Sequence, residues 1–145
     1  MSAVRYCNPE VDVIGPDESV QQAAGRMHAR KVGTLVVVDR ERVPVGIITD
    51  RDICVRVVAD GKATATPVGE VMTPCPETVR EQTSLEDVLR RMRAGAFRRL
   101  PVVNAREQLV GLLSLDDVLR VFAHDFAQIE RLMEQESPES LAEIV

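Results

Sequence analysis

The chain has 145 residues and a formal net charge of -5, which argues against a nucleic-acid partner, because phosphate neutralisation supplies most nonspecific affinity for nucleic acids. Hydrophobic residues make up 45% of the chain, but only 3% of residues are aromatic and Trp is absent, so few flat rings could stack on single-stranded bases. The core must therefore consist of Val, Leu, Ile, Ala and Met side chains.

The cysteines and the hydropathy pattern indicate in which cellular compartment the protein resides. Cys7, Cys54 and Cys75 are odd in number and form no CxxC pattern, which is typical of a reducing cytosol and not of a disulfide framework. No stretch approaches the length of a membrane span, and the first residues lack the apolar run of a signal peptide. We therefore expect a soluble, cytoplasmic protein without a membrane partner.

The first part of the chain predicts a short α/β unit. Residues 11–14 are extended, and Ser19 then begins a helix in a capping-box pattern. Apolar residues follow at helical spacing, namely Val20, Ala23, Ala24 and Met27. The β-branched runs at 35–38 and 45–48 are too short for helices and predict strands, and a second helix begins near Thr49.

The same order of elements returns 65 residues later without a gap. A helix is predicted after Ser84, strands at 100–103 and 110–113, and a further helix from Ser114. The aligned pairs include Ser19 with Ser84, Met27 with Met92, Gly46 with Gly111 and Asp52 with Asp117. Such a duplication predicts two units, each of which needs its twin to complete a core.

Each unit has a hydroxyl and, three residues later, a carboxylate where its last strand meets a helix: Thr49 with Asp52, and Ser114 with Asp117. The free N–H groups and positive dipole end of a helix attract an anion, and the hydroxyl adds a donor. The carboxylate can accept hydrogen bonds from two hydroxyl groups of a ligand. The alternative is a pair of helix caps, each stabilising its helix by about 0.5–2 kcal/mol, and capping does not exclude binding.

The segments Gly46–Asp52 and Gly111–Asp117 resemble the G-h-h-[S/T]-x-x-D signature of cystathionine-β-synthase-type (CBS) repeats. Val71–Pro74 and Arg98–Val103 are similar to the opening and the middle strand of a second repeat. The resemblance implies an α/β (α+β) fold in which tandem β-α-β-β-α repeats pack as a pseudo-twofold disc. It also implies repeat 1 at 4–62, repeat 2 at 69–125, and a C-terminal helix extension and acidic tail at 126–145.

In modules of this family, clefts between the repeats bind AMP, ADP, ATP, S-adenosylmethionine or NAD-type ligands. The resemblance therefore implies that Thr49, Asp52, Ser114 and Asp117 bind an adenosyl ligand and that the protein regulates an unidentified partner. No base, nucleophile and orienting group can be assembled from the motifs, and neither histidine has a cysteine at metal-ligand spacing. We expect no enzymatic activity, no metal and no cofactor apart from the regulatory ligand.

A basic residue of the facing repeat often completes the phosphate contact in such modules. By resemblance, Arg98 and Asp116 face the cleft of Thr49, which we call the Thr49 cleft. Arg51 faces the cleft of Ser114, the Ser114 cleft, with no opposing charge. We therefore expect the Ser114 cleft to prefer more phosphorylated ligands, unless Arg51 pairs with a neighbouring carboxylate.

Beyond the second repeat, Phe122, Phe126, Ile129 and Met133 form an a/d-like stripe that either packs on its own disc or makes a dimer contact, and we expect a homodimer. Pro138 should end this helix. Two functions remain open. The protein is a ligand sensor, or it is a structural dimerisation and assembly module with empty clefts. The presence of hydroxyl and carboxylate in both repeats favours the sensor.

Overall fold

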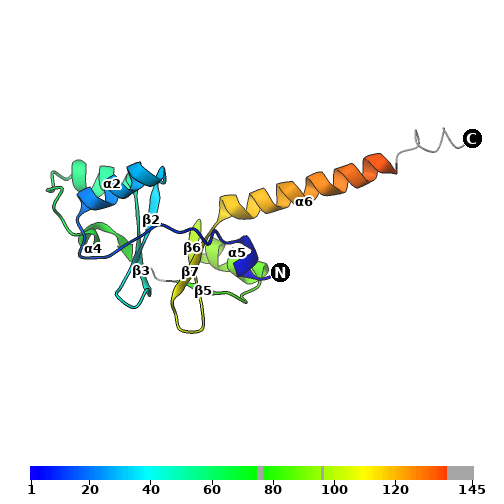
Figure 1. Cartoon of the computed structure of the whole chain (residues 1–145), viewed down its shortest axis with the longest axis horizontal. Coiled ribbons are helices and arrows are strands. Elements are labelled where there is room, and N and C mark those ends of the chain that lie inside the picture. The colour runs from blue at the N-terminus through cyan, green and yellow to red at the C-terminus, as the bar shows by residue number, and fades with distance from the viewer. Residues whose placement is uncertain (75–76, 96, 137–145) are drawn as a thin grey trace, which may run out of the picture.

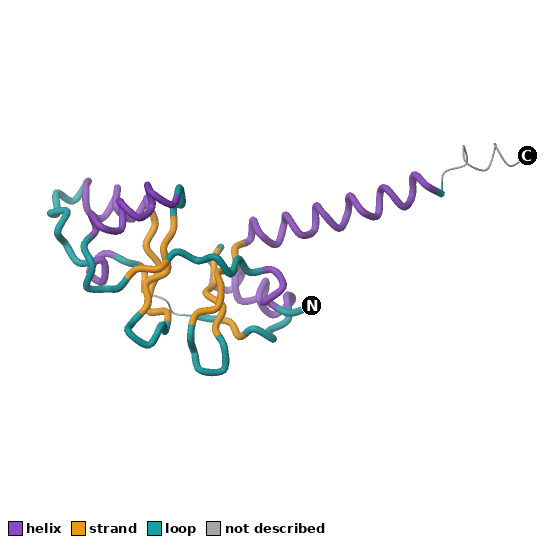
Figure 2. Tube along the Cα trace, viewed as in Figure 1, coloured by secondary structure: helices purple, strands orange, loops and turns teal. Residues whose placement is uncertain are grey.

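A computed structural model describes residues 1–74, 77–95 and 97–136 (Figure 1). These residues form a four-stranded sheet in the order β1-β2-β3-β4 and a three-stranded sheet in the order β5-β6-β7. Figure 2 shows the strands near the centre of the body, with helices on its outer sides. The predicted mixture of short strands and helices is confirmed. Cys75, the predicted helix end at Pro138 and the acidic tail lie outside the described residues.

The first half is built as predicted. Its elements are β1 (Val13–Ile14), α2 (Val20–Arg30), β2 (Thr34–Val38), β3 (Pro44–Thr49) and α3 (Asp50–Ile53), followed by a π-helical turn at Cys54–Val58. The Ser19 hydroxyl accepts from the Gln22 N–H at 3.1 Å, and the Gln22 side chain accepts from the Ser19 N–H at 2.8 Å. This capping box fixes the start of α2.

The second half repeats this plan in the same register. It contains β5 (Val79–Arg80), α5 (Leu85–Gly95), β6 (Arg99–Val103), β7 (Leu109–Ser114) and α6 (Leu115–Gln135). Leu35 pairs with Ile48 in the first half, and Leu100 pairs with Leu113 in the second. Both hairpins also shift register at equivalent places, between Val37 and Val38 and between Val102 and Val103.

Each half is completed by the segment that leads into the other half. The short helix α1 (Ala3–Tyr6) precedes the first half, yet Ala3 and Tyr6 are buried in the core of the second. In Figure 1, α1 accordingly lies beside α5. The twin helix α4 (Val68–Val71) precedes the second half, yet Val68 and Val71 are buried in the core of the first. The prediction that each unit needs its twin to complete a core is confirmed. The sequence did not predict that the units would do so by exchanging α1 and α4.

The sheets are extended by the same exchange. The strand β4 (Thr73–Pro74) is antiparallel to β3, where Thr73 pairs with Ile47. Sixty-five residues earlier, Asn8 forms an antiparallel bridge with Leu112 of β7. Two crossing connections therefore tie the halves together through backbone hydrogen bonds.

The helix α6 leaves the body after its first turns and extends away from both halves (Figure 1). Phe122 still packs near the body, with its ring centroid 6.4 Å from that of Tyr6. Farther along, Phe126 is 70% exposed and Met133 is 69% exposed, so Phe122 alone of the predicted stripe packs back on its own half and the rest of the stripe does not. Among the described residues, no helix is both long enough and apolar enough to cross a membrane.

Candidate ligand-binding clefts

The corner between β3 and α3 holds Thr49 and Asp52 in a reciprocal cap. The Thr49 Oγ1 accepts from the Asp52 N–H at 3.1 Å, and the Asp52 carboxylate accepts from the Thr49 N–H at 3.0 Å. The other carboxylate oxygen lies 3.7 Å from the Arg56 guanidinium, and the Asp52 side chain remains 16% exposed. The capping interpretation is therefore correct, but a carboxylate has about four acceptor positions, so capping leaves some for a ligand.

The corner between β7 and α6 differs in its hydrogen bonds. The Ser114 hydroxyl accepts from the Asp117 N–H at 3.1 Å and donates to the Asp117 carboxylate at 2.7 Å. Arg120 lies 3.6 Å from the same carboxylate, and the Asp117 side chain is 25% exposed. Asp117 is thus held in one orientation while part of it faces solvent.

A recess of about 310 Å³ opens beside Ser114 and Asp117. The facing wall comes from the first half and includes Val32, Gly33 and Thr34. The structure thus brings Gly33 of the first half to the Ser114 cleft. Leu112 adds an apolar side chain, while Arg99 and Arg120 supply positive charge. This volume lies at the lower end of the range of about 300–1,000 Å³ that is usual for small-molecule sites.

A second recess, of about 320 Å³, lies beside Thr49 and is lined by Gly33, Thr34, Thr49, Asp50, Arg51 and Arg99. Arg51 therefore sits next to Thr49 of its own repeat and is not among the described residues that line the Ser114 cleft. Arg51 is the second residue of α3, directly after Asp50. Its backbone N–H donates to the Asp50 carboxylate at 2.8 Å.

Two adjacent arginines take different positions. Arg98 lies 3.6 Å from Asp116, and both side chains are exposed, at 69% and 59%. Arg99, which the sequence analysis did not propose, lines the recess at Thr49 and the recess at Ser114. Thr34, the residue equivalent to Arg99 in the first repeat, lines the same two recesses. The alignment of the repeats could therefore have identified Arg99 as a residue between the clefts.

Cys7 packs against the core of the second half. Burial raises the pKa of the Cys7 thiol, and the charge of Asp117 acts in the same direction. A thiol with a raised pKa is a poor nucleophile at neutral pH. Among the described residues, no three His, Cys, Asp or Glu side chains are grouped so that they could hold a metal ion.

Two equivalent corners on duplicated halves, each facing a recess, define a tandem-repeat module with paired clefts. The family model described as CBS domain matches residues 3–59 and 68–124, and the chain belongs to this family. The predicted family and fold are confirmed.

Similar proteins support this assignment. The CBS domain-containing protein YhcV of Bacillus subtilis is 38% identical over 119 residues, covering 81% of this chain and 84% of YhcV. The crystal structure of CBSX2 in complex with AMP has a TM-score of 0.72 and 31% identity, and the match covers 85% of this chain and 96% of that one. CBSX2 is from Arabidopsis thaliana.

Other relatives are longer than the region they share with this chain. The match covers 65% of the uncharacterized protein MK0525 of Methanopyrus kandleri, at 33% identity. It covers 21% of CBSCBSPB1 of Arabidopsis thaliana, at 34% identity. The paired repeats thus occur both in short proteins and as parts of larger ones.

Proposed function

We propose that this chain is a non-catalytic regulatory module that binds an adenosyl ligand between its repeats and passes the binding signal to a partner protein. The observation that carries the proposal is the Ser114 cleft. There, an oriented carboxylate and a hydroxyl at the start of α6 face a recess of about 310 Å³. The ligand classes are AMP, ADP and ATP, with S-adenosylmethionine and NAD-type compounds as further candidates.

The groups in this cleft match the three parts of such a ligand. Val32 and Leu112 offer an apolar surface for the base, and Asp117 offers acceptors for the ribose hydroxyls. Arg99 and the positive dipole end of the 21-residue helix α6 would attract the phosphate, although the Leu115 and Asp117 N–H groups already donate to the Arg98 carbonyl and the Ser114 hydroxyl. The similarity to CBSX2, whose structure contains AMP, supports AMP as the first compound to test.

The Thr49 cleft offers a related set of groups. Thr49 and Asp52 stand at the positions equivalent to Ser114 and Asp117, and Arg51 and Arg99 add positive charge to the recess beside Thr49. Arg98 would contribute only after its exposed ion pair with Asp116 opens. A cytoplasmic location is part of the proposal, because the cysteine pattern suits a reducing compartment.

Thermal melts with AMP, ADP, ATP, S-adenosylmethionine and NADH would test the proposal. A ligand at one hundred times its Kd stabilises the native state by about 2.7 kcal/mol. For a domain of this size, the melting temperature should rise by roughly 5–15 °C. The variant carrying both Asp52→Ala and Asp117→Ala should lose this rise. If no compound at millimolar concentration raises the parent's melting temperature by more than about one degree, the structural assembly module becomes the better explanation.

We also propose that the protein forms a homodimer through α6. Leu119, Phe126, Ile129 and Met133 are exposed, and with Phe122 they alternate at spacings of three and four, as in a coiled-coil seam. Such a seam needs a second apolar helix, and an identical helix satisfies this need.

Charge favours an antiparallel pair of α6 helices. In a parallel pair, Asp125 of each copy would face Glu130 of the other, and like charges would repel on both sides. If Phe126 instead lies opposite Ile129 of the second copy in an antiparallel pair, Asp125 lies near Leu132 and Glu130 near Ala123. In that register, Asp125 and Glu130 of the two copies are kept apart, and the exposed parts of the two α6 helices overlap along their whole length.

A further inference from the structure

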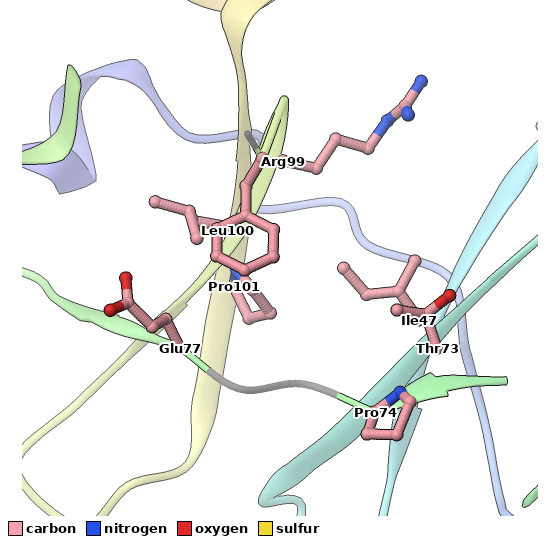
Figure 3. Close-up of a pocket in the computed structure, with 8 residues that line it drawn as sticks. Ile47, Thr73, Pro74, Glu77, Arg99, Leu100 and Pro101 are labelled. Carbon is pink, nitrogen blue, oxygen red and sulfur yellow. The ribbon is translucent and has the colours of Figure 1, made fainter. Parts of the chain in front are cut away.

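The Thr49 cleft contains a small apolar pocket that is the twin of part of the Ser114 cleft. Figure 3 shows this pocket between Leu100 and Pro101 of the second half and Ile47, Thr73 and Pro74. Its lining residues Ile47, Thr73 and Phe97 stand 65 positions from Leu112, Asn8 and Val32, which line the Ser114 cleft. The two spaces therefore occupy equivalent places in the two halves.

Their sizes differ several-fold. In the Thr49 cleft, the apolar pocket beside Ile47 and Phe97 has a volume of about 40 Å³ and is separate from the polar recess of about 320 Å³ beside Thr49. In the Ser114 cleft, the equivalent apolar space beside Leu112 and Val32 belongs to the single recess of about 310 Å³ that also reaches Ser114 and Asp117. A pocket of about 40 Å³ is far below the range of about 300–1,000 Å³ that is usual for small-molecule sites, so it has no room for a purine base. The larger recess reaches the size that small-molecule sites require.

The repeat symmetry breaks at the residues that cause this difference. Phe97 stands where the first half has Val32, and its ring lines the small pocket. Gly95 stands where the first half has Arg30, and a β-carbon at Gly95 would overlap the Phe97 ring. The glycine thus gives the ring its space.

The equivalent residues of the first half hold the Ser114 cleft open. The Arg30 Nε donates to the Asp12 carboxylate at 2.8 Å, so this long side chain is tied to the rim. Val32 is smaller than Phe and leaves the recess unfilled. Arg99 does not block the small pocket, because its side chain points away from that pocket in Figure 3.

We propose that the chain binds one adenosyl ligand, in the Ser114 cleft, and that Phe97 occupies the position of the base in the Thr49 cleft. This inference rests on the proposed function and adds the stoichiometry and the residue that sets it. The clefts are therefore unequal by shape, whereas the sequence suggested a difference in charge.

Titration calorimetry with AMP, and separately with ATP, would test the inference on the full chain. The parent should bind one ligand per chain. Phe97→Val should bind two, because it gives the Thr49 cleft the residue of its open twin. Val32→Phe should bind none, because it closes the Ser114 cleft in the same way. Melting temperatures and circular dichroism would check that each variant is folded.

Two further variants locate the site without changing its shape. Asp117→Ala should reduce the parent's affinity at least tenfold, and Asp52→Ala should leave it within about twofold; tenfold corresponds to about 1.4 kcal/mol. Two ligands bound by the parent, or loss of binding in Asp52→Ala alone, would overturn this inference and leave the proposed function intact. Binding of neither nucleotide by the parent would overturn both.

Discussion

Gly46 and Thr73 approach each other so closely that a β-carbon on Gly46 would lie 2.9 Å from the Thr73 carbonyl oxygen. The same β-carbon would overlap the Met72 side chain. In the other half, a β-carbon on Gly111 would lie 2.5 Å from the Cys7 Sγ and 3.0 Å from the Asn8 carbonyl oxygen. The glycine that opens each signature motif is therefore required by the edge segment that the other half supplies.

Gly46→Ala should lower the free energy of unfolding by about 1–3 kcal/mol, because the backbone of β4 must move to admit a methyl group. Gly25→Ala is the matched control. Gly25 lies within α2 with nothing near its missing β-carbon, so alanine there should stabilise by about 0.5–1 kcal/mol. Chemical denaturation would measure both changes. Equal effects of the two substitutions would contradict the steric role of Gly46.

Thr49→Ala and Ser114→Ala should each lower the free energy of unfolding by about 0.5–2 kcal/mol, because each hydroxyl caps a helix. Only Ser114→Ala should also weaken AMP binding, since only the Ser114 cleft has room for the base beside its hydroxyl and carboxylate. Denaturation and calorimetry on the same samples would separate the two effects. Unchanged AMP affinity in Ser114→Ala would show that the Ser114 hydroxyl caps α6 and does not contribute to ligand binding.

Arg99→Ala should weaken AMP binding by about 10- to 150-fold, because a hydrogen bond to a charged group contributes about 1.5–3 kcal/mol. Arg98→Ala is the control, since Arg98 forms an exposed pair with Asp116 and should change the affinity less than threefold. Calorimetry at one fixed salt concentration would compare them. A larger loss in Arg98→Ala would show that the ion pair opens to bind ligand.

Glu18 should make the stability of the first half depend on pH. Its pKa is lowered, chiefly by the hydrogen bond from Arg26, whose Nη2 lies 2.6 Å away. A lowered folded-state pKa means that the stabilisation is complete above the unfolded pKa of about 4.3. It is lost as the pH falls through the lower pKa of the folded protein.

Glu18→Gln should therefore cost about 0.2–1 kcal/mol at pH 7, a small value because both side chains are about one third exposed. The difference from the parent should disappear toward pH 3. Urea denaturation from pH 7 to pH 3 would show this, and Arg26→Gln should reduce the same pH dependence. A difference that grows on acidification would contradict the sign.

Phe126→Arg should convert the proposed homodimer into a monomer at micromolar concentration in light scattering, because it places charge in the α6 seam. Ala127→Arg, one residue farther along the exposed helix and outside the stripe, is the control and should leave the dimer intact. A monomeric parent, with and without nucleotide, would disprove the homodimer.

Cysteine cross-linking would determine the direction of the α6 pair. In a chain with its native cysteines replaced by Ala, Ala123→Cys and Glu130→Cys proteins should form a disulfide when mixed and not when oxidised separately. A Met133→Cys protein that cross-links alone would indicate a parallel pair.

Much of this fold could be predicted because the sequence pattern of each element occurs in both repeats. The strands at 35–38 and 100–103, and the caps at Ser19, Thr49 and Ser114, are local features that periodicity and hydrogen-bonding chemistry define. The exchange of α1 and α4 could not be predicted, since a four-residue segment with two apolar side chains to bury carries no information about which sheet it covers.

The site was predictable at its corners and less so across the cleft. Thr49, Asp52, Ser114 and Asp117 follow from the motif, whereas the position of Arg51 depends on how two sheets meet. The choice between Arg98 and Arg99 depends on the phase of a strand, because successive side chains point to opposite faces. The role of Phe97 follows from the volume of the pocket that its ring lines, and a residue pattern does not give the volume of a pocket.

The exchange of α1 and α4 also affects the order in which the two halves can fold during translation, and whether fragments of the chain can fold. Residues 3–6 are translated before their burial partners, such as Val88 and Leu113, which emerge about eighty to one hundred and ten residues later. The first half has all its buried core residues once Val71 is available, whereas α1, already released, must wait for the second half. A gene cut between the repeats would therefore give two fragments that each carry the other's helix, and neither should fold until they are mixed.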